Sequence, residues 1–458
     1  MKKNGLKIIF IIIIGFSFCA CKALRPLHNN SILTLPKQFS ENITMRIDND
    51  ENWWACLNNA ELKKLVKNAL INNFDIKIYK AKIAQAQARV AKENAGLFPS
   101  LDFSFNKQRT YNSQSIGNDS WGSSLNGSYN ADVWGKIRDR KKSQILYLNA
   151  AKEDLKKITL ELVGDIAETW VDIIAVRNKK MILNKQIKIN KAIIELQKFR
   201  FAQGKASALD ISQQRQALAQ TSSQVPMLAK LEKILLNKLA FFSGKNRITP
   251  LQVNTKVLPK PLPLPNIGIP SDLLSNRPDI RAARMRLSSS LWEVAAAKAD
   301  FLPSFKLSAK ALFSNGKLDL LFHDWIMTLG ASITGVIFDG GFKKAEVKRA
   351  KALANERINL YAKIVAKAVF EVEDSLVTIE RQKQFIILLR KELDLTKLTQ
   401  KDAMIRYKNG QSSYLPYLIA RSNVERLQRQ LVGEYANMIK QRIYLQKALG
   451  WTNTKKII

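Results

Sequence analysis

The hydrophobic positions of this chain follow two alternating periods, and the order of these periods is repeated. Residues 84–106 and 289–310 both pass from a helical pattern, through Pro-Ser, into strict alternation of apolar residues. The segment FRFAQGKASALDI around Gly204 corresponds to IRYKNGQSSYLPY around Gly410, at an offset of about 206 residues. A repeat of that length indicates a duplicated half-molecule rather than a solenoid. We therefore predict two structural repeats, 61–244 and 278–450.

Alternation with period two predicts a β-hairpin in each repeat, at about 101–133 and 304–338, with the last strand reaching Ile337. In the first hairpin the alternation is expected to stop over a polar loop, 107–119, and then return. Strands of about ten residues can cross a bilayer at a tilt. The small polar residues between the apolar ones favour a water-filled lumen; the alternative is a soluble hairpin pair packed on helices. Four strands per chain cannot close a barrel, so the membrane interpretation requires an oligomer.

Helical patterning fills most of the remaining chain. It begins near Glu61 and breaks at Asn72-Asn73. A second helical stretch extends from Lys136 to Ala202. A helix of that length, roughly 100 Å, needs neighbouring helices to pack against, as in a coiled coil. Gly204 and Gly410 are predicted to end the long helices at the tips of helical hairpins, about 136–244 and 342–450. Ser207 and Asp210 offer N-cap chemistry for the returning helix, and Pro226 should kink it. The Pro-rich segment 245–277 is predicted to be an extended connector, and 451–458 a C-terminal tail.

The N-terminus predicts export from the cytoplasm. Residues 1–20 combine a positive segment, Met1-Lys2-Lys3, with a short apolar run from Leu6 to Phe18, which is typical of a signal peptide. Phe18-Cys19-Ala20-Cys21 resembles a bacterial lipobox, which predicts covalent lipid, including palmitate, on Cys21; ordinary signal cleavage is the alternative. Lys22 then fits outer-membrane retention by the same resemblance. Residues 21–60 would form a lipid-anchored tether, and Cys56 would remain as the single thiol, so we expect no intrachain disulfide.

The formal net charge of +36 has two interpretations. One is nucleic-acid binding; the favoured one is a solvated basic surface, because the charge is spread over the whole chain without a basic arm. We expect the lysine excess to lie mostly outside any lumen. His28 and His323 are isolated, the acidic cluster Glu371, Glu373 and Asp374 suits solvated or lumen-facing charge, and we recognise no catalytic or metal-binding spacing. The chain is therefore not expected to be an enzyme or to hold a cofactor other than the lipid.

Several segments together resemble the TolC-like family of outer-membrane efflux proteins, and specifically its lipoprotein channels of multidrug efflux systems. They are the stretch from Asn52 to Gln87, Asp132–Lys136, Val225–Gly244, and DLLSNRPDIRAARMRL with Arg277-Pro278-Asp279. The resemblance implies an α+β membrane protein that forms a homotrimer. Its twelve-stranded β-barrel, with four strands from each chain, would continue into a long periplasmic α-helical coiled-coil barrel. The implied partners are a periplasmic adaptor and an inner-membrane transporter of the resistance-nodulation-division type.

The resemblance also assigns roles to residues at the tips. Gly204, Ser207, Gly410 and Ser413 would dock the adaptor, and the periplasmic gate candidates are Asp210, Tyr407, Tyr414, Pro416 and Ile419. Relatives often carry aspartates at the places of Pro416 and Ile419, so the acidic ring is in doubt here and a hydrophobic constriction is the alternative. Ile419 could equally pack between helices.

Aromatic residues near the strand ends could form membrane-interface girdles or pack in a core; they are Trp121, Tyr129, Trp134 and Trp325. The leading functional prediction is a passive outer-membrane export duct for drugs or other toxic small molecules. The alternative is the duct of a type I protein secretion system, and a remote alternative is a basic coiled-coil protein that binds nucleic acid.

Overall fold

The computed structural model describes residues 59–112, 115–245, 253–262 and 269–450, with five isolated positions, Pro36, Gln38, Phe39, Leu57 and Leu264. The predicted signal peptide, Cys21, Cys56 and the tail 451–458 lie outside the described residues. The chain divides into two compact units. We call the unit that includes Ala81–Glu153 and Asp279–Ile364 the strand unit, and the one that includes Leu35–Lys80, Asp154–Pro278 and Val365–Ile458 the hairpin unit.

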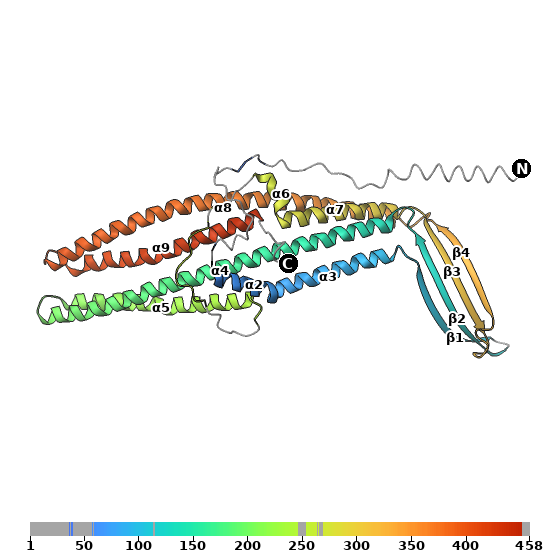
Figure 1. Cartoon of the computed structure of the whole chain (residues 1–458), viewed down its shortest axis with the longest axis horizontal. Helices are drawn as coiled ribbons and strands as arrows, with labels where there is room; N and C mark the ends of the chain where they lie inside the picture. Colours follow the sequence, from blue (N-terminus) through green and yellow to red (C-terminus); the bar gives the residue numbers. More distant parts are fainter. Residues whose placement is uncertain are drawn as a thin grey trace. The chain divides into compact units, whose positions relative to one another are not determined.

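The strand unit contains one antiparallel sheet of four strands in the order β1-β2-β3-β4 (Figure 1). The strands are β1 Ser100–Asn112, β2 Ser115–Ala131, β3 Ser304–Asn315 and β4 Trp325–Thr334. Each repeat supplies one hairpin, and the two hairpins join where β2 pairs with β3, with Leu125 opposite Ala311. The predicted hairpins are therefore present, and they form a single sheet.

The predicted polar loop 107–119 is wrong, because β1 continues to Asn112 and β2 already begins at Ser115. Backbone hydrogen bonds form the ladder regardless of side-chain polarity, and here polar side chains pair across it. Arg109 and Asp119 are directly opposite, with Arg109 Nε 3.5 Å from Asp119 Oδ1. The Lys107 ammonium lies 4.8 Å from the ring centroid of Trp121, which is opposite it.

The predicted end of the last strand at Ile337 is also wrong. Strand β4 ends at Thr334, which pairs with Ser304, the first residue of β3. Pro303 precedes Ser304 and has no N–H with which to extend the ladder. Ile337 consequently lies beyond the sheet and is fully exposed.

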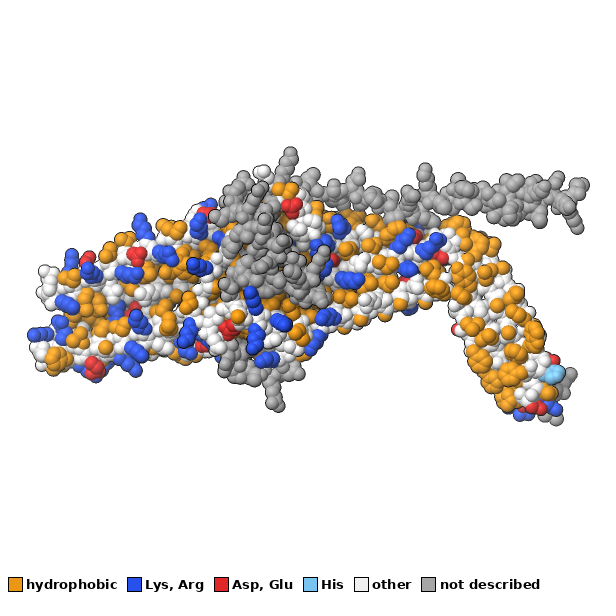
Figure 2. All heavy atoms as spheres, viewed as in Figure 1, with side chains coloured by type: hydrophobic (Ala, Val, Ile, Leu, Met, Phe, Trp, Pro, Cys, Tyr) orange, Lys and Arg blue, Asp and Glu red, His pale blue; other side chains and the backbone are white. Residues whose placement is uncertain are grey.

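One face of the sheet is apolar and exposed, and the other is polar. Nine large apolar side chains on the first face are 41–72% exposed: Leu101, Phe103, Phe105, Leu125, Leu307, Trp325, Met327, Leu329 and Ile333. Residues two apart on a strand, and residues directly opposite each other on neighbouring strands, point to the same face of a sheet, and these relations place all nine side chains on one face. Figure 2 shows this apolar surface over the strands. Ser, Thr and Asn dominate the other face, with Ser104 Oγ 2.8 Å from Ser124 Oγ across β1 and β2.

The helices agree closely with the predicted pattern. They are α2 Ala60–Asn72, α3 Phe74–Ala95, α4 Lys136–Ala202, α5 Ala208–Phe242, η3 Pro270–Asp272, α6 Leu273–Asn276, α7 Pro278–Ala299, α8 Phe342–Lys408 and α9 Tyr414–Leu449. The predicted limits of α4, 136 and 202, are confirmed. Helix α5 is continuous through Pro226, so the predicted kink remains a prediction. Among the described residues, none of the helices combines the length and hydropathy that crossing a membrane requires.

The predicted break at Asn72-Asn73 is confirmed and has a clear cause. The Asn73 side chain is buried and accepts hydrogen bonds from the backbone N–H of Asp75 at 2.8 Å and of Ile76 at 3.2 Å. Its amide also donates to the carbonyl oxygen of Phe242 at 2.9 Å. Asn73 therefore starts α3 and fastens it to the end of α5.

Arg277 of the Arg277-Pro278-Asp279 segment contacts two helices of the hairpin unit, α8 and α9. Arg277 is buried, and its Nη1 donates to Glu371 Oε2 of α8 at 2.7 Å and to the Ala448 carbonyl of α9 at 2.8 Å. The interpretation of Glu371 as a solvated charge is therefore wrong, because its carboxylate neutralises a buried guanidinium. Pro278 then starts α7, where a missing N–H costs nothing.

The prediction that the whole connector 245–277 is extended is wrong, because it contains η3 Pro270–Asp272 and α6 Leu273–Asn276. Residues 253–262 contain no helix or strand. The Glu61 carboxylate accepts hydrogen bonds from the backbone N–H of Asn254 at 2.7 Å and of Thr255 at 3.2 Å. These contacts fix the connector against the start of α2.

Candidate functional site

The two predicted hairpin tips have nearly identical backbone geometry. Gly204 and Gly410 adopt the left-handed conformation, with φ of 68° and 73°. The residue after each glycine donates its N–H to a carbonyl five positions earlier, Lys205 to Arg200 at 2.8 Å and Gln411 to Arg406 at 2.9 Å. This pattern ends a helix and turns the chain with few unpaired carbonyl groups, and only glycine takes it without strain. The tip prediction is confirmed at the level of the backbone.

The start of the returning helix differs between the tips. At the first, Ser207 Oγ accepts the Asp210 N–H at 3.1 Å, and Asp210 Oδ2 accepts the Ser207 N–H at 3.0 Å. At the second, Ser413 is the N-cap without a side-chain cap, and Pro416 occupies the place of Asp210. Proline has no N–H to offer to a cap, and it is tolerated in a first turn. The acidic character of Asp210 is thus explained by helix capping, and its part in a gate stays a prediction.

A tyrosine cluster connects the two helical hairpins close to the tips. Tyr407 of α8 donates its hydroxyl to Gln197 Oε1 of α4 at 3.1 Å, and Tyr414 of α9 donates to Gln214 Oε1 of α5. The rings of Tyr407 and Tyr414 meet edge to face, with centroids 5.2 Å apart. The Arg200 guanidinium lies 4.8 Å from the Tyr407 ring centroid. Two gate candidates are therefore brought together.

Side-chain amides continue this cluster into the helices. Gln214 Nε2 donates to Asn190 Oδ1 at 3.0 Å, and Asn190 Nδ2 donates to Thr221 Oγ1 at 3.3 Å. Gln214 is 0% exposed, Asn190 2% and Tyr414 1%. Burial raises the pKa of Tyr414 above its ordinary value, although the nearby Arg421 opposes the shift. Tyr414 therefore remains a hydroxyl donor throughout the physiological pH range.

The sequence analysis missed the amide partners Asn190, Gln197 and Gln214. A signal was present on α4, where Gln186, Asn190 and Gln197 recur at helical spacing on one face. All three are buried. This stripe of amides on one helix face was the signal that could have identified them.

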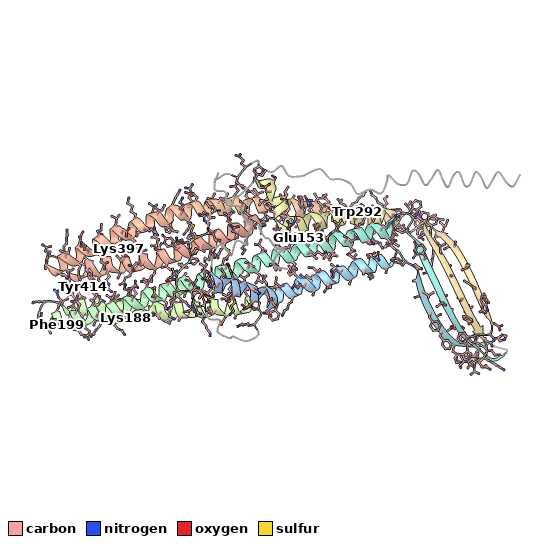
Figure 3. The ribbon with its side chains drawn as sticks, viewed as in Figure 1. Glu153, Lys188, Phe199, Trp292, Lys397 and Tyr414 are labelled. Atoms are coloured by element: carbon pink, nitrogen blue, oxygen red, sulfur yellow. The ribbon has the colours of Figure 1, made fainter. Side chains whose placement is uncertain are left out.

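The remaining gate candidates lie at the surface of the single chain. Pro416 is exposed, and Ile419 is 53% exposed. Whether Ile419 packs between helices or narrows the entrance therefore stays a prediction. Other exposed apolar side chains lie at the same helix ends, where Figure 3 shows Phe199 and Tyr414: Phe199, Phe201, Leu209, Ile405 and Leu415.

The four girdle candidates lie near the two ends of the sheet. Trp121 and Trp325 are on the apolar face near the hairpin turns, and Tyr129 is on the same face near the helices. Trp121 and Tyr129 are about 26 Å apart along β2, close to the roughly 25 Å band of a membrane barrel. Trp134 instead donates its indole N–H to the Pro303 carbonyl at 2.7 Å, which fixes the junction of strand and helix.

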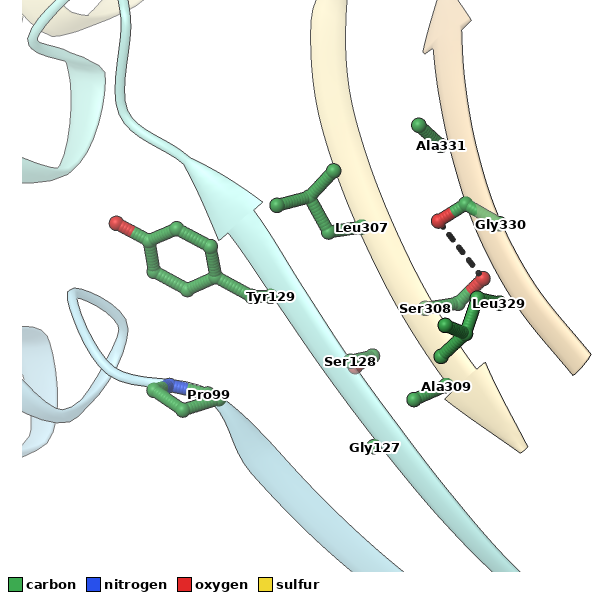
Figure 4. Close-up of a pocket in the computed structure, with 10 residues that line it drawn as sticks. All are labelled: Pro99, Gly127, Ser128, Tyr129, Leu307, Ser308, Ala309, Leu329, Gly330 and Ala331. Carbon is green, nitrogen blue, oxygen red and sulfur yellow. Dashed lines mark hydrogen bonds between the residues drawn. The ribbon is translucent and has the colours of Figure 1, made fainter. Parts of the chain in front are cut away.

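A shallow depression lies beside Tyr129 on the apolar face (Figure 4). It is formed where small residues interrupt the row of large side chains, and it is lined by Pro99, Gly127, Tyr129, Leu307, Ala309, Leu329 and Ala331, with parts of Ser128, Ser308 and Gly330. Its lining is mostly apolar. No group of three or more His, Cys, Asp or Glu that could hold a metal ion occurs among the described residues.

Solved structures share this arrangement of sheet and helical hairpins. CusC, studied for folding and transmembrane channel formation, superposes with a TM-score of 0.85 at 21% identity, over 93% of this chain and 99% of CusC. The CmeC outer membrane channel of Campylobacter jejuni superposes with a TM-score of 0.83 at 22% identity, over 93% of this chain and 94% of CmeC. The fold is that of these channels.

Curated proteins of similar sequence cover nearly the same length. The pyoverdine export outer membrane protein OpmQ of Pseudomonas putida is 27% identical over 418 residues, which is 88% of each chain. The toluene efflux pump outer membrane protein TtgI of Pseudomonas putida is 28% identical over 404 residues, 85% of each chain. The family model described as outer membrane efflux protein matches twice, at residues 65–245 and 269–451, and so coincides with the two repeats. With both repeats matched and the sheet and hairpin tips formed, the chain belongs to the outer membrane efflux protein family.

Proposed function

We propose that three copies of this chain form an outer-membrane duct through which an inner-membrane transporter exports toxic small molecules. The observation that carries the proposal is the two-faced sheet. Its exposed apolar face is unsuited to water and suited to lipid, and its polar face is suited to a water-filled lumen. Among the described residues, β1 and β4 each leave one edge without a partner strand. Pairing β4 of one chain with β1 of the next closes a barrel and removes these edges.

The hairpin tips are the proposed docking surface for a periplasmic adaptor. Gly204, Ser207, Gly410 and Ser413 shape the turns, and exposed Phe199, Leu209 and Leu415 surround them. Exposed apolar residues at a tip favour contact with another protein. The adaptor would connect the duct to the transporter.

The lipid anchor on Cys21 is part of the proposal. A Cys21→Ser variant should lack the acyl mass that intact-mass spectrometry detects on the mature wild-type protein. An unmodified wild-type N-terminus would contradict the anchor and leave the duct itself unaffected.

A deletion strain tests the duct directly. Deleting the gene should sensitise cells to several unrelated toxic compounds, and the detergent-extracted protein should have the mass of a trimer in light scattering. A monomer together with unchanged sensitivity would contradict the proposal.

Two alternatives predict different companions. A type I protein secretion duct would copurify with a dedicated peptide-exporting transporter and would leave drug sensitivity unchanged. A nucleic-acid-binding protein would fractionate with the cytoplasm and show steep salt dependence of binding. Crosslinking at the tips, followed by identification of the membrane partner, separates these possibilities.

A further inference from the structure

The polar face of the sheet carries more basic than acidic side chains. Lys306 and Lys310 of β3 alternate with Phe305, Leu307 and Ala309 of the apolar face, so both lysines belong to the polar face. Over the described strand residues, Asp102 of β1 is the one acidic residue on that face. The polar face of each chain therefore has a net charge of about +1.

These lysines are not neutralised within the sheet. Lys310 lies opposite Asn126 and Thr328, and Lys306 lies opposite Asn130 and Ser332. Both lysines are exposed, and neither makes an ion pair with a described residue. Asp102 is in register with Asn126, so β2 separates it from Lys310.

The basic residues of the opposite face differ in this respect. Lys107 and Arg109 belong to the outward face near the hairpin turn, and Asp119 lies 3.9 Å from the Lys107 ammonium and 3.5 Å from Arg109 Nε. The sheet thus pairs its outward cations and leaves its two polar-face lysines unpaired.

From this contrast we infer that the barrel lumen favours anionic cargo, with Lys306 and Lys310 as its specificity-determining residues. The inference rests on the proposed function, because it needs the polar faces of three chains to enclose one lumen. Three chains would then place six lysines at two levels, about 13 Å apart along the strand. A water-filled passage with low-dielectric walls concentrates ions of the opposite charge. The cargo class is small organic molecules with carboxylate, phosphate or sulfonate groups.

At the second tip, the two positions where relatives often carry the aspartates of an acidic ring have no negative charge that would oppose anionic cargo. Positions 416 and 419 hold Pro and Ile, so neither contributes a carboxylate. Our expectation that the lysine excess lies mostly outside the lumen stays a prediction, and Lys306 and Lys310 are the exceptions on the polar face.

A cysteine between the two lysines can report the local potential without a requirement for an open gate. Ser308 is exposed on the polar face, two residues from each lysine. In full-length trimer reconstituted in phospholipid vesicles, with Cys56→Ser, a Ser308→Cys variant is treated with an anionic and a cationic methanethiosulfonate. Each rate is divided by the rate for a free thiol. At low salt the anionic reagent should be favoured by about tenfold.

Charge variants assign the effect to the lysines. Lys306→Glu with Lys310→Glu should reverse the ratio, Lys306→Arg with Lys310→Arg should preserve it, and Lys107→Gln on the outward face should leave it unchanged. The mass of each variant verifies that it forms a trimer. The arginine variant, which should keep the wild-type rate ratio, controls for any structural effect of substituting the two lysines.

The possible outcomes separate the inference from the function on which it depends. A Ser308→Cys thiol that reacts with the cationic reagent at least as readily would overturn the anion preference and leave the duct intact. A thiol that reacts with neither reagent, while an outward Ala309→Cys thiol reacts, would overturn the assignment of faces and with it both proposals.

Discussion

The Tyr414 hydroxyl should help to hold the two helical hairpins together at their tips, and Tyr414→Phe isolates that contribution. The ring is kept, so packing against Tyr407 and Tyr417 persists, with centroid distances of 5.2 and 5.7 Å in the wild type. What is lost is the donor to Gln214 Oε1, a group that is 0% exposed. A buried acceptor left without a partner costs about 1–3 kcal/mol.

This cost applies only while the hairpins are in contact, because separated hairpins would admit water to Gln214. The substitution should therefore shift the equilibrium between closed and separated tips by about 5- to 150-fold. Cells that carry Tyr414→Phe should admit a large hydrophilic antibiotic such as vancomycin more readily. The purified protein should show faster backbone hydrogen exchange in peptides spanning residues 195–215 and 405–420.

Tyr147→Phe is the matched control. Its ring is 40% exposed, and its hydroxyl makes no hydrogen bond with the described residues, so the loss of that hydroxyl should change neither readout. Unchanged exchange at the tips together with unchanged vancomycin entry in Tyr414→Phe would refute the reasoning, since the bond would then contribute nothing to closure.

Three further predictions concern stability. Asn73→Ala removes a buried cap and a hydrogen bond to α5, and should lower the free energy of unfolding by about 2–4 kcal/mol. The control Asn72→Ala, at an exposed position, should lower it by less than about 0.5 kcal/mol. Thermal melting of the detergent-solubilised protein compares the two variants, and equal losses would contradict the capping role of Asn73. Gly204→Ala should cost about 1–2 kcal/mol for its left-handed backbone alone, and Gly244→Ala considerably more, because a Cβ there would lie 2.2 Å from the Asn72 carbonyl oxygen; the same melts test this order. Burial acts to raise the pKa of Glu232, but Arg177 and Lys180 outweigh it and hold the pKa below the usual 4.5. The stability that this ion pair contributes is present above pH 4.5 and is lost as the pH falls through the lowered pKa. Glu232→Gln should therefore flatten the acid side of a pH–stability curve, and an unchanged slope would contradict this role of Glu232.

Elements whose ends are marked by local signals, such as glycines and capping residues, could be predicted from the sequence. Helix α4 was bounded correctly because Gly135, with a φ of 78°, precedes it and Gly204 follows it. The start of α4 is further fixed by Asp132, whose carboxylate accepts the N–H of Ile137 at 3.0 Å and of Arg138 at 2.9 Å. Such signals are local, so a single sequence contains them.

Features that depend on cross-strand or cross-helix partners could not be predicted in the same way. The polar ends of β1 and β2 looked like a loop because their stability comes from backbone pairing and from contacts such as Arg109 with Asp119, not from apolar alternation. The role of Glu371 was misjudged because its partner, Arg277, is 94 residues away in sequence. Periodicity identifies which face of an element is apolar, but it does not identify the partner of a polar side chain.

The tyrosine cluster near the tips shows a consequence of the duplication other than the supply of two similar helical hairpins. At the offset of about 206 residues, Tyr407 and Tyr414 correspond to Phe201 and Ala208, while Gln197 and Gln214 correspond to Ala403 and Ala420. The second repeat thus supplies the hydroxyl donors and the first repeat supplies the amide acceptors, with neither set present in the other copy. Each of these bonds therefore forms between unlike repeats. A ring built from six copies of either repeat would therefore lack one side of each of these pairs.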